Sequence, residues 1–397
     1  MSAPSRRIMG VTYAIRELYP LARELEEKGH KVLYLNIGDP ARWGFTPPDH
    51  AKEALYRAVV EGYNYYSPSE GLLELREAIV EKEKSWNNVE IDPDHVFVTF
   101  GVTEAIWLVL VSLLDPGDEV LMPDPCYPIY PAYCKLLDAK PVYYRCSEEN
   151  AWEPDIKDLR SKVSGRTKAV VIINPNNPTG AVYSEETVRE ILDVASERNL
   201  VVISDEIYDA IVYEGEFKST ASLTDEVPVI GLNGLSKTFL MTGWRIGYVY
   251  VKAPEEYEWI AKALKRAAYT RLGASTPIQK AAAEALRGPL DHLENMRRKL
   301  RERRDLIYKL LKDSEYFDVV KPNGAFYILP KLLVRAWRDD KDFAEKLLLE
   351  KKVLVVHGSG LGEASRWHIR LTFLPPPDVI EEALTRINEF TSMVAKT

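Results

Sequence analysis

The chain has 397 residues, of which 46% are hydrophobic and 28% are charged, and it carries a net charge of −8. This length is sufficient for two domains with substantial cores, and the composition is ordinary for a globular protein. The negative charge argues against nucleic acid and anionic membranes as main partners.

Cysteine, histidine and hydropathy patterns exclude further classes. The three cysteines include no CxxC pair, which argues against a disulfide framework, and the six histidines show no HExxH motif or close pairing that would predict a metal site. The first residues, MSAPSRRIMG, lack the apolar core of a signal peptide. The longest apolar stretch, residues 105–114, is too short to span a bilayer. We therefore expect a cytoplasmic protein without a membrane partner.

The N-terminal part mixes helices with one short strand. Residues 14–28 are patterned as an amphipathic helix, and residues 31–37 alternate like a strand that ends at the turn Gly38-Asp39-Pro40. The Pro/Gly-rich residues 40–48 are typical of a loop that crosses between domains. Two helical segments follow, residues 50–61 and 72–86, with NYYSPSEG between them.

A regular alternation of strands and helices begins near residue 96. Seven short and mostly continuous apolar runs predict strands at residues 96–100, 119–122, 141–145, 169–173, 200–204, 227–232 and 247–251. Helical patterns separate most of them. This arrangement is typical of a buried, largely parallel sheet in an α/β domain.

The last third of the chain predicts a smaller α+β domain. Residues 255–287 are helical in pattern with a break at 273–277, and a long charged helix follows at 290–312. The remaining pattern predicts strands at 325–329, 353–357 and 368–373 and helices at 341–350 and 378–395. We place an N-terminal arm and part of the small domain at 1–45, the large domain at 46–287 and the small C-terminal domain at 288–397.

Two short motifs have ordinary explanations. The basic run RRKLRERR at residues 297–304 is interleaved with acidic residues in an acidic protein, which favours a solvated helix face over a nucleic-acid site. The loop GSGLG at residues 358–362 breaks the GxGxxG spacing because Glu363 follows it, and no βαβ unit is predicted there.

One lysine is set in an apolar loop. Residues 233–250 read NGLSKTFLMTGWRIGYVY, so Lys237 lies among leucine, phenylalanine and methionine, with Arg245 eight residues further on. Desolvation there would lower the pKa of the lysine and make it an imine-forming nucleophile. A plain loop cation is the alternative interpretation.

Polar residues follow the predicted strands at the edge of the sheet where ligands bind in α/β folds. Gly101-Val102-Thr103-Glu104 precedes an apolar helix and predicts a phosphate cradle, or else a tight turn capped by Thr103. Tyr127 lies in the proline-rich PDPCYPIY and is either a ring-stacking or a packing tyrosine. Asn177 belongs to NPNNPTG, whose prolines fix amide groups for hydrogen bonding.

Asp205 completes this set. It follows five mostly apolar residues, where a carboxylate needs a cationic partner or several donors, or serves as a helix N-cap. One edge thus combines a phosphate cradle, an arginine, a stacking tyrosine, an amide, a buried carboxylate and a lysine. A phosphorylated, planar, nitrogen-containing aldehyde would use all of them, and pyridoxal 5'-phosphate is such a molecule.

The ordered series YSPSEGLLELR, NPNNPTG, SDEIY, SKTFLMTGWRIGY and HIRLTF resembles the fold-type I pyridoxal-phosphate aminotransferases of class I and II over nearly the whole chain. YAIR, LNIGDP, NGLSKT and RLGASTPIQ are most similar to the alanine aminotransferase branch. The resemblance implies an α/β fold, with a large cofactor-binding domain around a mostly parallel seven-stranded sheet and a smaller α+β domain.

The resemblance also implies the roles of residues around the cofactor ring. Lys237 would form the internal aldimine and then move a proton between the substrate Cα and the cofactor C4′. Asp205 would pair with the pyridine nitrogen. Tyr208 and Asn177 would hydrogen-bond the ring oxygen O3′, and Tyr127 would stack on the ring.

For the phosphate, the resemblance implies Val102, Thr103, Ser236 and Arg245. Some relatives carry a serine three residues before the lysine, whereas Gly234 stands there in this chain. Tyr66 would reach the phosphate of the neighbouring subunit, which implies a homodimer with shared active sites.

On the substrate side, Arg370 would bind the α-carboxylate as a bidentate pair, assisted by Asn177 and the backbone of Gly38. Arg271 falls where aspartate-type relatives place an arginine for the distal carboxylate of dicarboxylic substrates. We expect it to bind that carboxylate, from its own or the partner subunit, with a surface salt bridge as the alternative. Tyr13 is expected to cover the small substrate side chain.

The expected activity is transfer of an amino group between L-alanine and 2-oxoglutarate by a ping-pong route through Lys237. The alternatives are an aminotransferase for aspartate, aromatic or other amino acids, and a pyridoxal-phosphate-dependent β-lyase of the same fold. A cofactor-sensing regulator would need a DNA-binding module, for which no segment is left over. A nicotinamide dehydrogenase is disfavoured by the missing GxGxxG motif.

Overall fold

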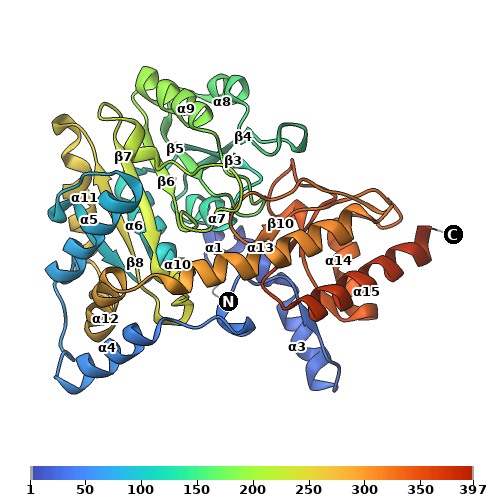
Figure 1. Cartoon of the computed structure of the whole chain (residues 1–397). Coiled ribbons are helices and arrows are strands. Elements are labelled where there is room, and N and C mark those ends of the chain that lie inside the picture. The colour runs from blue at the N-terminus through green and yellow to red at the C-terminus, as the bar shows by residue number, and fades with distance from the viewer. Residues whose placement is uncertain (1–2, 396–397) are drawn as a thin grey trace.

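The structure, a computed structural model, describes residues 3–395. A seven-stranded sheet lies at its centre, with the strand order β2-β8-β7-β6-β5-β3-β4 (Figure 1). Its strands are β2 (Val96–Thr99), β3 (Glu119–Asp124), β4 (Lys140–Arg145), β5 (Thr167–Ile173), β6 (Val201–Asp205), β7 (Val229–Gly234) and β8 (Gly247–Lys252). Within this sheet β8 is antiparallel to both of its neighbours, and the other pairs are parallel. The predicted α/β fold with a mostly parallel seven-stranded sheet is confirmed.

Both faces of this sheet are buried. In β5, Val170 and Ile172 pack into one apolar cluster, whereas Val171 and Ile173 pack into another, because successive side chains of a strand point to opposite faces. This is why the strands are continuous apolar runs rather than alternating ones. The first face is covered by α5 (Leu73–Asn87), α8 (Ile156–Lys162), α9 (Glu185–Arg198) and α12 (Thr276–Arg287), and the second by α6 (Val102–Leu113), α7 (Ile129–Leu136) and α11 (Trp259–Tyr269).

A smaller unit forms beyond the long helix α13 (Asp291–Lys312), which extends from the large sheet towards it (Figure 1). Its three-stranded sheet has the order β10-β14-β13. The elements are β10 (Tyr327–Ile328), β13 (Val356–His357), β14 (Ile369–Thr372), α14 (Asp340–Lys351) and α15 (Pro377–Ala395), with the two-stranded pair β9 (Phe317–Asp318) and β11 (Lys331–Leu332) alongside.

The N-terminal segment packs against this C-terminal unit. Strand β1 (Leu33–Tyr34) pairs in parallel with β12 (Val353–Leu354), and Leu18, Leu25 and Leu35 lie in the same apolar cluster as the core of the small unit. The chain then crosses to the large sheet through α4 (Asp49–Val60). The domain boundaries placed from the sequence stay predictions.

Several local elements differ from the sequence-based expectation. The helix expected at 14–28 is interrupted at Leu18, so that α2 (Ala14–Glu17) and α3 (Tyr19–Glu27) are separate. Pro20 lies in the first turn of α3, where its missing N–H costs nothing. The strand expected at 353–357 is divided into β12 and β13, which pair with different partners. Among residues 3–395, no helix combines the length and the apolar content needed to cross a membrane.

Candidate active site

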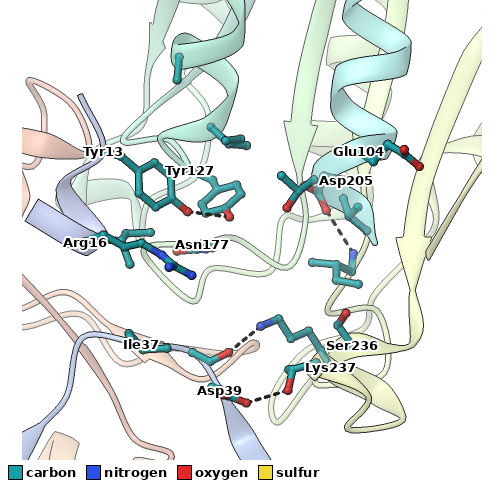
Figure 2. A pocket seen from close by; sticks show the side chains of 18 of the residues that line it. Tyr13, Arg16, Ile37, Asp39, Glu104, Tyr127, Asn177, Asp205, Ser236 and Lys237 are labelled. Carbon is teal, nitrogen blue, oxygen red and sulfur yellow. Dashed lines mark hydrogen bonds between the residues drawn. The ribbon is translucent and has the colours of Figure 1, made fainter. Parts of the chain in front are cut away.

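A cavity of about 1040 Å³ lies at the carboxyl ends of the parallel strands, between the large sheet and the smaller unit. Most of the site residues predicted from the sequence line it, namely Tyr13, Gly38, Val102, Thr103, Tyr127, Asn177, Asp205, Tyr208, Ser236, Lys237, Arg245 and Arg370. Tyr66 and Arg271 of the same chain do not line it. Figure 2 shows how the labelled side chains converge from opposite walls.

Lys237 lies on the single-turn helix α10 (Leu235–Thr238), directly after β7, which directs its side chain into the cavity (Figure 2). Its Nζ donates a hydrogen bond to the backbone oxygen of Gly38 at 2.6 Å. Burial lowers the pKa of Lys237 to about 8, although the charge of Asp39 opposes the shift. A substantial fraction of this amine is therefore neutral near physiological pH, which is the form that attacks a carbonyl carbon.

Asp205 ends β6 on the opposite side of the cavity and is 3% exposed. Its carboxylate accepts hydrogen bonds from Tyr130 Oη at 2.9 Å and from the backbone N–H of Ile207 at 3.4 Å. Burial raises its pKa to about 6, and these donors oppose the shift. No cationic side chain among residues 3–395 forms an ion pair with it, so a cation bound in the cavity would be its natural partner.

The N-terminus of α6 and Arg245 form the third wall. Gly101 precedes this helix with φ +79°, and a Cβ there would lie 2.6 Å from Nη2 of Arg245. The left-handed backbone conformation favours glycine here, and the guanidinium occupies the space that a Cβ would take. Arg245 donates to the backbone oxygens of Thr242 and Phe100 at 2.9 and 3.2 Å, which fixes it beside the free amides of the helix.

Arg370 projects from β14 of the smaller unit and is 1% exposed. Its Nη1 donates to Oδ1 of Asn177 at 2.9 Å and its Nη2 donates to the backbone oxygen of Asn36 at 2.6 Å. Its Nε is buried without a hydrogen-bond partner. An arginine held on one side and unsatisfied on the other is prepared to bind an anion from the cavity.

Two tyrosines link the N-terminal segment to the large sheet. Tyr13 and Tyr127 share a hydrogen bond between their hydroxyl oxygens at 3.0 Å, and their rings meet edge to face with centroids 6.5 Å apart (Figure 2). Tyr127 lies after β3 and faces the cavity, as the sequence analysis expected. Both tyrosines line the cavity.

Tyr327, Tyr130 and Asp39 are among the residues in or beside the cavity that were not identified from the sequence. Tyr327 lies in a short strand without any polar motif, yet its hydroxyl is 3.0 Å from that of Tyr208 and would clash with any Cβ at Gly38. Tyr130 lies in the quoted PDPCYPIY segment, where Tyr127 alone was selected. Asp39 follows Gly38 and accepts a hydrogen bond from Thr242 Oγ1 at 2.7 Å. The turn signal in this segment could have indicated Asp39, but nothing local indicated Tyr327.

Arg271 and Tyr66 point to other surroundings. Arg271 donates to the backbone oxygen of Val98 at 2.6 Å, and its Nε lies 3.6 Å from Oε2 of Glu104. Tyr66 is 78% exposed. Within one subunit, therefore, neither side chain reaches the cavity, and a contribution of either residue would have to come from a partner subunit.

Comparisons with known proteins agree with this geometry. Residues 30–387 match the family model described as aminotransferase class I and II. The glutamate-pyruvate aminotransferase AlaA of Haemophilus influenzae is 38% identical over 395 residues, which cover 98% of each chain. The structure of an alanine aminotransferase from Pyrococcus furiosus superposes with a TM-score of 0.96 at 52% identity, covering 98% of this chain and 100% of that one. A probable aspartate/prephenate aminotransferase of Aquifex aeolicus is 40% identical over 93% of each chain.

Proposed function

Because this chain belongs to the class I and II aminotransferase family and is a pyridoxal-phosphate-dependent transaminase, we propose that it transfers the amino group between L-alanine and 2-oxoglutarate. The observation that carries the proposal is the arrangement of Lys237 and Asp205 on opposite sides of one cavity, with Arg370 and Asn177 at its substrate end. The full-length similarity to enzymes named alanine or glutamate-pyruvate aminotransferase supports the choice of substrates.

The residues of the cavity fit pyridoxal 5'-phosphate, the cofactor of this family. Asp205 is a buried carboxylate without a cationic partner among the described residues, and a protonated pyridine nitrogen would provide that partner. The cradle of Gly101, Arg245 and the α6 N-terminus provides donors for a phosphate, with Ser236 beside them. When bound, the cofactor supplies an electron sink for negative charge that develops at the substrate Cα.

Lys237 acts as the base and acid of the reaction. With the cofactor bound, its amine would accept the proton of the substrate Cα and later give that proton back, a task suited to a pKa lowered to about 8. The backbone oxygen of Gly38, which accepts a hydrogen bond from Nζ at 2.6 Å, holds the amine in the cavity between these steps.

Arg370 and Asn177 orient the substrate. The α-carboxylate binds the unsatisfied side of the Arg370 guanidinium, while Asn177 and the Asn36 carbonyl hold the other side in place. Fixing the carboxylate directs the Cα hydrogen towards Lys237. Orientation of this kind lowers the activation barrier, because the bound substrate has already lost its rotational freedom. Tyr208 and Tyr127 would contact the cofactor ring, and Tyr13 is hydrogen-bonded to Tyr127 at the same cavity.

A half-reaction tests this function directly. The purified holoenzyme, given L-alanine alone, should release one equivalent of pyruvate and convert its cofactor to the amine form. The change in cofactor absorbance measures this conversion. Adding 2-oxoglutarate should then restore the original spectrum and release glutamate. Continuous pyruvate and ammonia release from a β-substituted amino acid, without conversion of the cofactor, would instead identify a lyase.

Aspartate is the second candidate amino donor, because the Aquifex aeolicus relative is named for aspartate and prephenate. Pockets that distinguish small substrates differ by contacts of only about 1–3 kcal/mol, so the fold alone does not decide between the donors. Half-reaction rate constants for alanine, aspartate, glutamate and tyrosine, measured under one set of conditions, rank them. A faster reaction with aspartate than with alanine would replace the proposed donor.

A homodimer with shared sites is part of the proposed function. Large side chains are exposed on two segments that contact one another, with Tyr65 57%, Tyr66 78%, Tyr269 59% and Leu272 61% exposed. The hydroxyl of Thr276 donates to the backbone oxygen of Tyr65, which joins these segments. Such an apolar surface supports an interface with a second copy, in which Tyr66 would reach the cofactor phosphate of the neighbouring subunit.

Subunit mixing tests this interface. Co-purified chains carrying Lys237→Ala and Tyr66→Ala, on different tags, form a heterodimer in which one site combines an intact Lys237 with an intact Tyr66 if the sites are shared. That heterodimer should recover about half of the wild-type activity, whereas each variant homodimer is impaired. No recovery in a heterodimer shown to exist by light scattering would place Tyr66 within its own subunit's site or outside the site.

A further inference from the structure

A transaminase of this kind must bind substrates of two lengths in one cavity. Alanine presents a methyl group beyond its α-carbon, whereas glutamate and 2-oxoglutarate present a second carboxylate. Arg370 is committed to the α-carboxylate under the proposed function, so another cation must bind the distal one. The predicted residue for this task, Arg271, donates to Val98 and lies near Glu104 in its own subunit.

Arg16 is a cation that the sequence analysis did not assign. It lies on α2, lines the cavity, and extends its guanidinium from the wall that carries Tyr13 towards the interior (Figure 2). Among residues 3–395, no carboxylate forms an ion pair with Arg16, and its side chain makes no hydrogen bond. Its charge is therefore available to a ligand.

The other cations of the cavity are all engaged with the protein. Lys237 donates to Gly38, Arg245 donates to two backbone oxygens, and Arg370 donates to Asn177 and Asn36. The acidic side chains that line the cavity also have partners, since Asp39 accepts from Thr242 and Glu104 accepts from the backbone N–H of Phe100. Arg16 is thus the cavity cation, within the described part of the chain, whose side chain has no hydrogen-bond partner in the protein.

The backbone on either side of Arg16 is fixed, although α2 is only one turn long. The backbone oxygen of Ile15 accepts a hydrogen bond from Asn36 Nδ2 at 3.1 Å, and Ala14 is buried. Glu17 pairs with His357 Nε2 at 3.0 Å and with Lys341 of α14. The Cα of Arg16 is therefore held in place while its long side chain remains exposed and adjustable. The guanidinium can turn towards a distal carboxylate or point into water.

We propose that Arg16 binds the distal carboxylate of dicarboxylic substrates and so makes this site accept glutamate and 2-oxoglutarate as well as alanine and pyruvate. This inference rests on the proposed transaminase function and adds the residue that distinguishes its two classes of substrate. With the short substrates the guanidinium stays in water, so alanine is bound without leaving a desolvated charge unpaired. With the long substrates it forms a charge-assisted hydrogen bond at the cavity mouth.

The test compares Arg16→Gln and Arg16→Lys with two control variants. Arg23→Gln removes the same charge from an exposed position on α3, and Arg271→Gln tests the residue predicted first. Half-reaction rate constants are measured for glutamate and 2-oxoglutarate against alanine and pyruvate. We expect Arg16→Gln to lower kcat/KM for the dicarboxylic pair about 10- to 100-fold relative to the short pair, from the loss of one charge-assisted contact. Arg16→Lys should recover part of this loss, and Arg23→Gln should leave the ratio unchanged.

Equilibrium binding supplies a readout apart from turnover. Glutarate and pentanoate have the same chain length but carry two carboxylates and one, and their dissociation constants from the holoenzyme can be measured by calorimetry. The preference for glutarate over pentanoate should fall about 10-fold or more in Arg16→Gln and should weaken with salt in the wild-type enzyme.

Three outcomes would overturn the proposal. Equal losses for alanine and glutamate in Arg16→Gln would show a structural role for the residue. A selective loss in Arg271→Gln, together with an unchanged ratio in Arg16→Gln, would assign the distal carboxylate to Arg271. An unchanged preference for glutarate would remove Arg16 from the binding site. Failure of the wild-type enzyme to react with either alanine or glutamate would instead refute the proposed function itself, so the two failures are distinguishable.

Discussion

The two ends of the cavity are built differently. At the cofactor end, Lys237, Asp205 and Arg245 come from the large sheet or from the loops beside its strands. Asp205 and Arg245 are held by contacts within that unit, and Lys237 donates to Gly38 of the N-terminal segment. At the substrate end, Arg370 and Arg16 come from the smaller unit and the N-terminal segment, and each retains a donor without a protein partner. The first end is arranged to hold one permanent ligand and the second to exchange ligands of different lengths.

The difference also appears in the ionisation of the buried groups. At the cofactor end, burial shifts the pKa of Lys237 down to about 8 and that of Asp205 up to about 6, so the neutral form of each group is more populated than it would be in water. A bound cation at Asp205 would reverse its shift, because an opposite charge stabilises the carboxylate. The cofactor is thus expected to supply the charge that pairs with Asp205. Removing a residue at this end should therefore lower activity more than removing one at the substrate end.

The largest effect is expected for Lys237→Ala. Loss of the amine removes the group that carries the Cα proton, and the alanine half-reaction should slow by about 10⁴-fold. Stopped-flow absorbance measures the rate, and borohydride reduction followed by peptide mapping should label Lys237 in the wild type and no peptide in the variant. A label on another lysine would move the covalent attachment away from this residue.

Asp205→Asn should cause the second-largest loss of activity. The amide cannot balance a pyridinium, and breaking a buried ion pair costs about 3–5 kcal/mol, which corresponds to roughly 10²–10³ in kcat if it is felt fully in the transition state. Tyr130→Phe serves as a graded control, because it removes one donor to Asp205 and leaves the charge in place. Wild-type turnover in Asp205→Asn would contradict the assigned role.

Arg370→Gln tests the substrate end. It should raise KM for alanine, pyruvate, glutamate and 2-oxoglutarate together by about 10- to 100-fold, because all four carry the carboxylate bound by this guanidinium. Steady-state kinetics with each substrate gives the four values. The increase in KM should be similar for all four substrates, in contrast to the selective loss expected for Arg16→Gln. A change confined to glutamate and 2-oxoglutarate would assign the distal carboxylate to Arg370 instead of Arg16.

The last prediction concerns stability rather than activity, at Glu206, the neighbour of Asp205 that lies outside the cavity lining. Burial raises its pKa to about 8 from an ordinary value of 4.5, its Oε2 has no partner, and Glu83 adds to the shift. The folded state therefore retains a proton that the unfolded state loses, so the free energy of unfolding should fall as pH rises from about 4.5 to about 8.

In Glu206→Gln this dependence should be weaker by a few kcal/mol across that window, since each pKa unit corresponds to about 1.36 kcal/mol. Urea unfolding of wild type and variant at several pH values between these limits gives the difference. The alanine half-reaction serves as the control, because Glu206 lies outside the cavity lining. Parallel pH profiles for the two proteins would show that Glu206 is already ionised in the folded state.

Much of the fold was predictable because its signals are local. Six of the seven strands of the large sheet are mostly apolar runs, and burial on both faces makes those runs continuous, whereas the edge strand β4 is only partly buried. The predictions were weaker where elements depend on distant partners. The strand expected at 31–37 is reduced to β1, whose two residues pair with β12 near the other end of the chain.

The sequence by itself indicated the cofactor end, because Asp205 and Lys237 come after predicted strands, Arg245 comes just before one, and each belongs to a recognisable motif at one edge of the sheet. At the substrate end the family resemblance indicated Arg370, but only the tertiary structure showed which residues hold it. Arg370 meets the backbone of Asn36 across 334 residues, and such a contact has no periodicity along the chain. It exists because the N-terminal segment and the C-terminal strands bury their apolar faces together.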